Sequence, residues 1–131
     1  MSVTFTLVTP VEVSEERFED MVADALETIP EELAEQLENI AIIVQDWPTE
    51  EQLDGRHGTL LGLYEGIDLT RRSPLGYAGV MPDRITIFRG PLCATARDEA
   101  DLERQVRVTV LHEVGHYFGM SDERLHELGW A

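Results

Sequence analysis

The sequence predicts a single α+β domain, and three observations support that prediction. Segments with helical periodicity alternate along the chain with short apolar runs of strand length. The 131 residues suit one hydrophobic core, and neither a repeat nor a linker divides them, so we expect one domain over 1–131. With 43% hydrophobic residues, the composition is that of a globular protein rather than a disordered one.

The first third of the chain predicts two helices. Residues 3–8 alternate threonine with apolar residues, and we expect an N-terminal extension or an extra strand within 1–13. Ser14 has the character of an N-cap, because two glutamates follow it in the first turn. Pro30 then separates this helix from a shorter one expected over 31–38. Apolar residues at three- and four-residue steps form the buried faces: Phe18, Met21, Val22, Ala25, Leu26, Ile29, Leu33 and Leu37.

Three strands are expected in the middle of the chain. Residues 40–44 are continuously apolar, 59–65 form a second core segment, and 84–88 alternate before a Gly-Pro break. Residues 49–55 predict a turn or a short helix. The intervening residues 66–82 are rich in Gly, Pro and Arg without periodicity, which predicts a long loop, and such loops are often functional.

Residues 98–118 predict one long helix that is largely covered. One apolar stripe comprises Leu102, Val106, Val110, Val114 and Tyr117, while Val108 and Leu111 extend it to a second side. A separate stripe of the same helix carries Gln105, Thr109, His112 and His116.

The most informative segment, residues 112–122, reads His-Glu-Val-Gly-His-Tyr-Phe-Gly-Met-Ser-Asp. His112 and His116 lie one turn apart on one helix face, where two imidazoles can converge on a Zn²⁺ ion. Glu113 lies about 100° further round the helix, so it is poorly placed to bind the ion beside them. It is well placed to take a proton from a water molecule that the zinc ion acidifies. The motif therefore predicts a zinc-dependent peptidase site with Glu113 as general base.

Two histidines are too few, because catalytic zinc usually has three protein ligands and a water molecule. Gly119 can end the helix in a left-handed conformation and turn the chain back, which would bring Asp122 towards the ion. Asp122 is therefore the expected third ligand, although Ser121 also has the character of an N-cap that would place Asp122 in a first helical turn. His126 follows one turn later and is the alternative third ligand.

Composition excludes several classes of function. The formal net charge is −16, and eleven acids against one base fall within residues 12–38, so we expect no nucleic-acid binding. Solvated helix faces explain that acidic run, and attraction of basic substrates is the alternative. Cys93 is the only cysteine, so no disulfide framework is expected. We see no signal peptide and no apolar run of membrane-spanning length, and the default expectation is a cytoplasmic protein without a membrane partner.

The chain resembles the short bacterial zincin-like metallopeptidases, also called minimal zincins, over roughly residues 14–130. The resemblance rests mainly on HEVGHYFGMSDERLHELG at 112–129, with support from LLGLYEGIDL at 60–69 and PDRITIFRGP at 82–91. It implies a small mixed β-sheet packed against the long active-site helix, with a zinc cleft between them. It also implies His112, His116 and Asp122 as zinc ligands and Glu113 as general base.

The leading hypothesis is a zinc metallopeptidase acting on a peptide or protein substrate. Tyr64, Tyr77, Arg89 and Tyr117 are unranked candidates for an additional donor to the substrate oxygen. A peptide can add as a strand at a sheet edge, and 85–88 is the edge that we expect. Two alternatives are a structural metal module, in which a fourth protein ligand closes the site, and an interaction protein with a vestigial site. The sequence does not predict an oligomeric state.

Overall fold

The computed structural model describes residues 11–37, 40–55, 59–66 and 83–131, and the predicted α+β class is confirmed there. Residues 1–10 of the expected extension and 67–82 of the expected loop lie outside the described residues. The elements follow in the order α1 (Glu15–Glu27), α2 (Glu31–Ala34), β1 (Ile40–Gln45), α3 (Glu50–Leu53), β2 (Gly62–Glu65), β3 (Asp83–Phe88), α4 (Arg89–Thr95), α5 (Glu99–Tyr117) and α6 (Asp122–Leu128).

The three described strands form a mixed sheet in the order β1-β3-β2. β3 pairs with β1 in parallel and with β2 antiparallel, so it is the central strand. The expectation that residues 85–88 form a sheet edge was therefore wrong. Ile85 and Ile87 are fully buried, as a central strand requires. Pairing partners distant in sequence decide which strand is central, and the alternation within β3 does not identify them.

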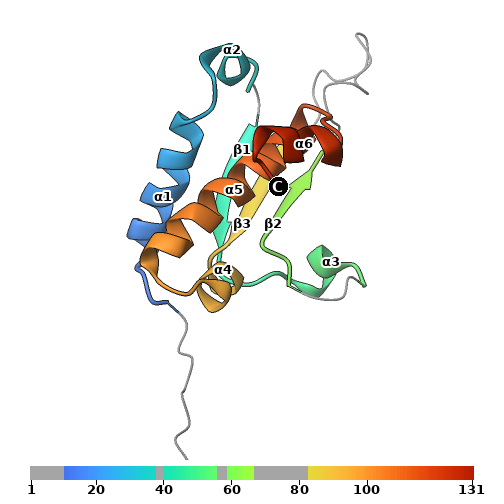
Figure 1. Ribbon diagram of the computed structural model, residues 1–131. Helices are drawn as coiled ribbons and strands as arrows, with labels where there is room; N and C mark the ends of the chain where they lie inside the picture. Colours follow the sequence, from blue (N-terminus) through green and yellow to red (C-terminus); the bar gives the residue numbers. More distant parts are fainter. Residues whose placement is uncertain (1–10, 38–39, 56–58, 67–82) are drawn as a thin grey trace, which may run out of the picture.

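Helices α1 and α5 pack across one face of the sheet, and their ribbons lie side by side in Figure 1. Ile42, Ile85 and Tyr64 form one cross-strand row, and Val44, Ile87 and Gly62 form the next. Apart from Gly62, which has no side chain, the residues of these rows contribute their side chains to the core between the sheet and the two helices. The core also contains all six residues predicted to be buried on the first helix, with Leu26 only partly buried and Ile29 just beyond the end of α1: Phe18, Met21, Val22, Ala25, Leu26 and Ile29.

The predicted cap of the first helix forms, and two further helix starts have local explanations. The Ser14 hydroxyl accepts a hydrogen bond from the Arg17 amide at 3.0 Å, which caps α1. Thr49 and Gln52 form a reciprocal capping box on α3, within the segment expected to be a turn or short helix. The expected break near Gly90 is instead helix α4. Pro91 is accommodated there because it lies in the first turn, where an amide N–H has no partner within the helix.

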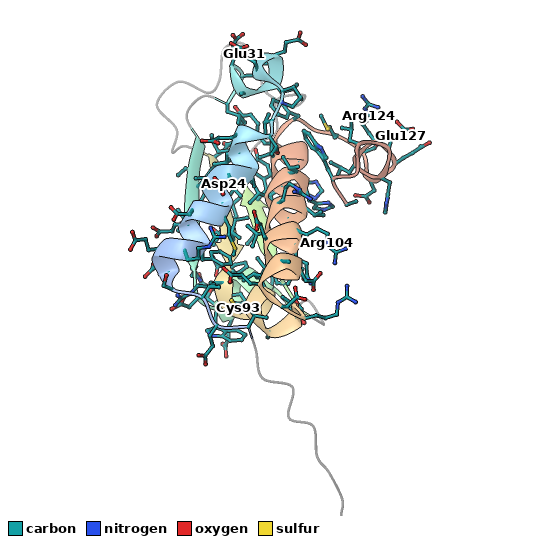
Figure 2. All side chains as sticks on the ribbon, turned by 60° about the vertical axis from the view of Figure 1, so that its left-hand side comes forward. Asp24, Glu31, Cys93, Arg104, Arg124 and Glu127 are labelled. Atoms are coloured by element: carbon teal, nitrogen blue, oxygen red, sulfur yellow. The ribbon has the colours of Figure 1, made fainter. Side chains whose placement is uncertain are left out.

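The acidic residues of α1 and α2 are exposed to solvent, as expected if the acidic run forms solvated helix faces. Figure 2 shows Asp24 and Glu31 projecting outward from these two helices, and both residues are exposed. The lone cysteine, Cys93, is buried. Among the helices of the described residues, none combines the length and apolar character needed to cross a membrane.

Candidate metal centre

Helix α5 directs the two motif histidines to the edge of the core. All five residues of the predicted apolar stripe, Leu102, Val106, Val110, Val114 and Tyr117, are fully buried. Because this stripe fixes how α5 rotates on the sheet, His112 and His116 emerge together, half-buried, at its border. The site therefore lies near the C-terminal end of α5, where α6 follows (Figure 1).

The imidazoles of His112 and His116 face one another. Their Nε2 atoms are 3.0 Å apart, and their ring planes are 89° to one another with centroids 4.6 Å apart. Glu113 joins them, since one ligand atom from each of His112, Glu113 and His116 lies within 4.8 Å of the others. The three motif residues thus form one compact donor group, as their spacing predicted.

The separation of the two nitrogens fits a single Zn²⁺ ion. Two nitrogens bound tetrahedrally at about 2.0–2.1 Å from zinc lie about 3.3 Å apart. The 3.0 Å between the Nε2 atoms differs from that value by a few tenths of an ångström. A second contact orients one ring, because His112 Nδ1 lies 3.0 Å from the carbonyl oxygen of Trp130. The donor set is therefore suited to zinc, which favours imidazole nitrogen.

The surroundings keep His116 in the neutral form that binds metal. Burial lowers the pKa of His116 below its ordinary value of 6.5, and the neighbouring His112 lowers it further. Asp122 acts in the opposite direction, through the attraction of its carboxylate for a protonated imidazole. The net effect is downward, so the neutral His116 imidazole, the form that binds metal, is favoured.

Glu113 lies between α5 and strand β2, and only 8% of its surface is exposed. Gly62 of β2 faces it closely: a Cβ atom at Gly62 would lie 3.1 Å from Glu113 Cγ and 2.8 Å from Thr109 Cγ2. The absence of a side chain at Gly62 thus allows the backbone of β2 to approach the expected base. This arrangement places the carboxylate beside both the histidine pair and the strand.

The turn after α5 forms as predicted and carries Asp122 back towards the site. Gly119 has a φ of +74°, and the Met120 amide donates to the Gly115 carbonyl at 3.0 Å, which is the Schellman arrangement. Ser121 caps α6 through a 3.1 Å hydrogen bond from the Arg124 amide, so Asp122 also occupies a first helical turn. Asp122 is exposed and its charge reaches His116, but the compact donor group does not include it. Its ligation of zinc stays a prediction.

His126, the alternative third ligand, is exposed on α6, and the same donor group does not include it either. α6 itself projects from the domain: Figure 2 shows Arg124 and Glu127 on its outer side, where they form an ion pair at 3.1 Å.

The candidate donors to a substrate oxygen make other contacts. Tyr64 donates to Asp83 Oδ2 at 2.5 Å, and Tyr117 donates to the backbone carbonyl of Gln36 at 3.2 Å. Arg89 forms an ion pair with Asp46 at 2.8 Å. Tyr77 lies outside the described residues. These contacts give Tyr64, Tyr117 and Arg89 structural roles.

Sequence reasoning missed three residues that shape the site: Gly62, Gly115 and Trp130. A glycine inside a strand pattern signals a close approach of another backbone or side chain, so Gly62 was detectable. Gly115 allows α6 to pack on α5, because a Cβ at Gly115 would overlap with Leu125 Cδ2. Trp130 contributes its backbone carbonyl, and since every residue has one, no residue type marks the contact.

Comparisons with known proteins identify the family of this chain. The sequence model of the zincin-like metallopeptidase family matches residues 37–130, well over half of the chain. Among solved structures, a conserved hypothetical protein from Thermus thermophilus is similar at a TM-score of 0.55 and 25% identity, covering 88% of this chain and 97% of that chain. The comparison with curated proteins found no match. The match to the family model, which includes the histidine pair and Glu113, shows that the chain belongs to the zincin-like metallopeptidase family.

Proposed function

We propose that this protein is a zinc-dependent metallopeptidase that hydrolyses peptide bonds in a peptide or protein substrate. His112, His116 and Asp122 hold the zinc ion, and Glu113 is the general base. One observation carries the proposal: the ligand atoms of His112, Glu113 and His116 lie within 4.8 Å of one another, beside strand β2. Membership of the zincin-like family supports the same reaction class.

The chemistry of the residues follows from their placement. When bound, zinc supplies Lewis acidity, which lowers the pKa of a water molecule to about 7 and polarises a substrate carbonyl. Glu113 would accept a proton from the attacking water molecule and return it to the departing amine nitrogen. Only 8% of Glu113 is exposed, so its electrostatic interactions with neighbouring groups are less screened by water.

Strand β2 offers a place for the substrate backbone. It is the outer strand beside β3 within the described part of the chain. The Phe88 amide donates to the Leu61 carbonyl at 2.9 Å, and antiparallel pairs alternate in direction, so the backbone N–H and C=O of Gly62 point away from β3. A peptide that pairs with this edge would pass the Glu113 carboxylate, which lies next to Gly62.

Zinc stoichiometry and peptide cleavage together test the proposal. We expect about one zinc per chain in the wild type after dialysis against trace zinc, with clear loss in Asp122→Ala. Glu113→Gln should retain zinc and lose hydrolysis of a mixed peptide library, because the amide cannot accept the proton. Cleavage by Glu113→Gln at the wild-type rate would show that the mechanism is wrong. A wild type that retains no zinc would instead favour an interaction protein with a vestigial site.

His126 separates the catalytic site from a structural one. A structural zinc site is closed by four protein ligands, whereas a catalytic site keeps one position open. Asp122 interacts electrostatically with His116, which favours it over His126 as the third ligand and leaves the fourth position open. We therefore expect His126→Ala to keep both its zinc and its activity. Loss of zinc in both His126→Ala and Asp122→Ala would favour the structural module.

A further inference from the structure

We propose that helix α6 and the residue after its cap act as a clasp on the metal centre: the Trp130 backbone carbonyl holds His112 in the tautomer that binds zinc. The clasp comprises Leu125, Gly129 and Trp130, and Leu125 packs against Gly115 of α5. This inference rests on the proposed zinc site and adds a positioning role for α6 to it. The contact that carries it joins His112 Nδ1 to the Trp130 carbonyl oxygen at 3.0 Å.

The direction of that hydrogen bond fixes the protonation of the ring. A carbonyl oxygen only accepts, so His112 Nδ1 carries the hydrogen and donates it. The other nitrogen of a neutral imidazole then has its lone pair exposed, and His112 Nε2 is the atom that faces His116 Nε2 at 3.0 Å. The opposite tautomer would place a hydrogen on Nε2, where it would block the metal. The Trp130 carbonyl therefore selects the form of His112 that binds zinc.

Two features hold the Trp130 carbonyl in place. Gly129 ends α6 in the left-handed conformation, with a φ of +76°, and the Trp130 amide then donates to the Leu125 carbonyl at 2.8 Å. The Trp130 indole is buried in the core, with 8% of its surface exposed. Because the backbone is hydrogen-bonded on one side of this carbonyl and the side chain is anchored, its position is set by the fold.

The same helix is fitted to α5 within the motif itself. Leu125 of α6 is fully buried and its Cδ2 lies where a Cβ of Gly115 would be, so a larger residue at Gly115 would force the Leu125 side chain or α6 to shift. Gly115 lies directly before His116. Docking of α6 therefore determines two things at the site together: the position of the Trp130 carbonyl and that of Asp122 at the start of the helix. By linkage, zinc binding should in turn stabilise the docked helix.

Zinc affinity and the tautomer of His112 test the clasp separately. Partners behind a metal-bound histidine typically change metal affinity by about 10–100-fold when they are removed. We expect a loss of that size in Trp130→Ala, measured by competition for Zn²⁺ with a chromophoric chelator. Trp130→Phe, which keeps an aromatic anchor, should retain most of the affinity. Val22→Ala, a core change on α1, is the matched control for general loss of stability, and it should bind zinc as the wild type does.

Nitrogen-15 NMR of the metal-free protein provides the second measurement. In the wild type, His112 should show the Nδ1–H tautomer, and Trp130→Ala should shift it towards a mixture. Gly129→Ala, a milder change at the positive φ, should shift it in the same direction and serves if Trp130→Ala does not fold. An Nε2–H tautomer in the wild type, or unchanged zinc affinity in Trp130→Ala, would overturn the clasp. A wild type that binds no zinc but shows the Nδ1–H tautomer would overturn the proposed function alone.

Discussion

Strand β2 approaches α5 closely at Gly62, and we expect a side chain at this position to disturb the candidate site. Replacing Gly62 with alanine adds one Cβ atom, 2.8 Å from Thr109 Cγ2 and 3.1 Å from Glu113 Cγ. Carbon atoms in ordinary contact lie about 3.5–4.0 Å apart. The first pair must therefore separate by about 0.7 Å or more. Gly62 has no positive φ, so alanine adds no backbone strain, and the whole effect is steric.

The clash should outweigh the gain in strand propensity. Alanine is favoured over glycine in a strand by about 0.5–1 kcal/mol. Overpacking a core site costs about 1–3 kcal/mol, and the site cannot relax easily because Thr109 is buried and β2 is hydrogen-bonded to β3. We expect Gly62→Ala to lower the free energy of unfolding by about 1–2 kcal/mol. Displacement of Glu113 should also reduce kcat of the proposed reaction, by up to about a hundredfold.

A second substitution should relieve the clash. Thr109→Ser removes the Cγ2 methyl group that the new Cβ would meet. Thr109→Ser alone should lower the free energy of unfolding by about 0.8 kcal/mol, the contribution of one buried carbon. In Gly62→Ala/Thr109→Ser the serine leaves room for the alanine, so the two changes should show a coupling of about 1 kcal/mol in the stabilising direction. Part of the loss in kcat should remain, because the new Cβ would still meet Glu113 Cγ at 3.1 Å.

Urea denaturation of the four proteins in this cycle measures the coupling. Trp130 is a suitable fluorescence reporter, because 8% of it is exposed in the folded protein, against 61% of Trp47. The zinc content should be equal in all four, since neither residue is an expected ligand. If the two substitutions are additive, or if Gly62→Ala is as stable as the wild type, the packing of β2 against α5 does not control this site.

Three further predictions concern charge and backbone conformation. In so far as it depends on His116, zinc affinity should begin to fall at a lower pH than it would for a histidine with the ordinary pKa of 6.5, because burial and the neighbouring His112 lower the pKa of His116. A chelator competition series over pH in which affinity already fell above pH 7 would contradict this. Asp101 accepts a hydrogen bond from the Arg97 amide, helped by Arg104 and Gln105, which lowers its pKa from 3.8 to about 2. The wild type should therefore be more stable than Asp101→Asn by the full amount above pH 3.8, and this advantage should disappear as the pH falls through about 2. Urea denaturation at a series of acid pH values measures the difference, and a difference that does not change with pH would contradict the prediction. Gly119→Ala should lower the free energy of unfolding by about 1 kcal/mol, because the turn after α5 needs a φ of +74°, and an unchanged urea midpoint would count against that turn.

The local elements of this fold were predictable because short-range physics decides them. The Ser14 and Ser121 caps, the left-handed Gly119 and the buried stripe of α5 each depend on residues within a few positions of one another. The predicted helix 98–118 differs from the observed Glu99–Tyr117 by one residue at each end. Helix α4 was missed because a glycine and a proline suggest a break, although proline is tolerated in a first turn.

In the candidate site, too, the contacts within one helix were predictable and the contacts between elements were not. The spacing of His112, Glu113 and His116 predicted their convergence, since one helix turn brings the histidines together whatever surrounds them. The spacing did not place Asp122, whose position depends on how α6 packs against α5 through Gly115 and Leu125. The expected edge at 85–88 failed because strand order depends on pairing between segments far apart in the chain.

The sequence by itself therefore determined the helix and the spacing that bring His112, Glu113 and His116 together. Only the tertiary structure decided which strand lies beside Glu113, which backbone carbonyl contacts His112, and how closely β2 approaches Glu113. The physical reason is the range of the interactions. Helix periodicity and capping act within a few residues. Gly62 lies 51 positions from Glu113, and Trp130 lies 18 positions from His112. These pairs of residues meet only when the core packs.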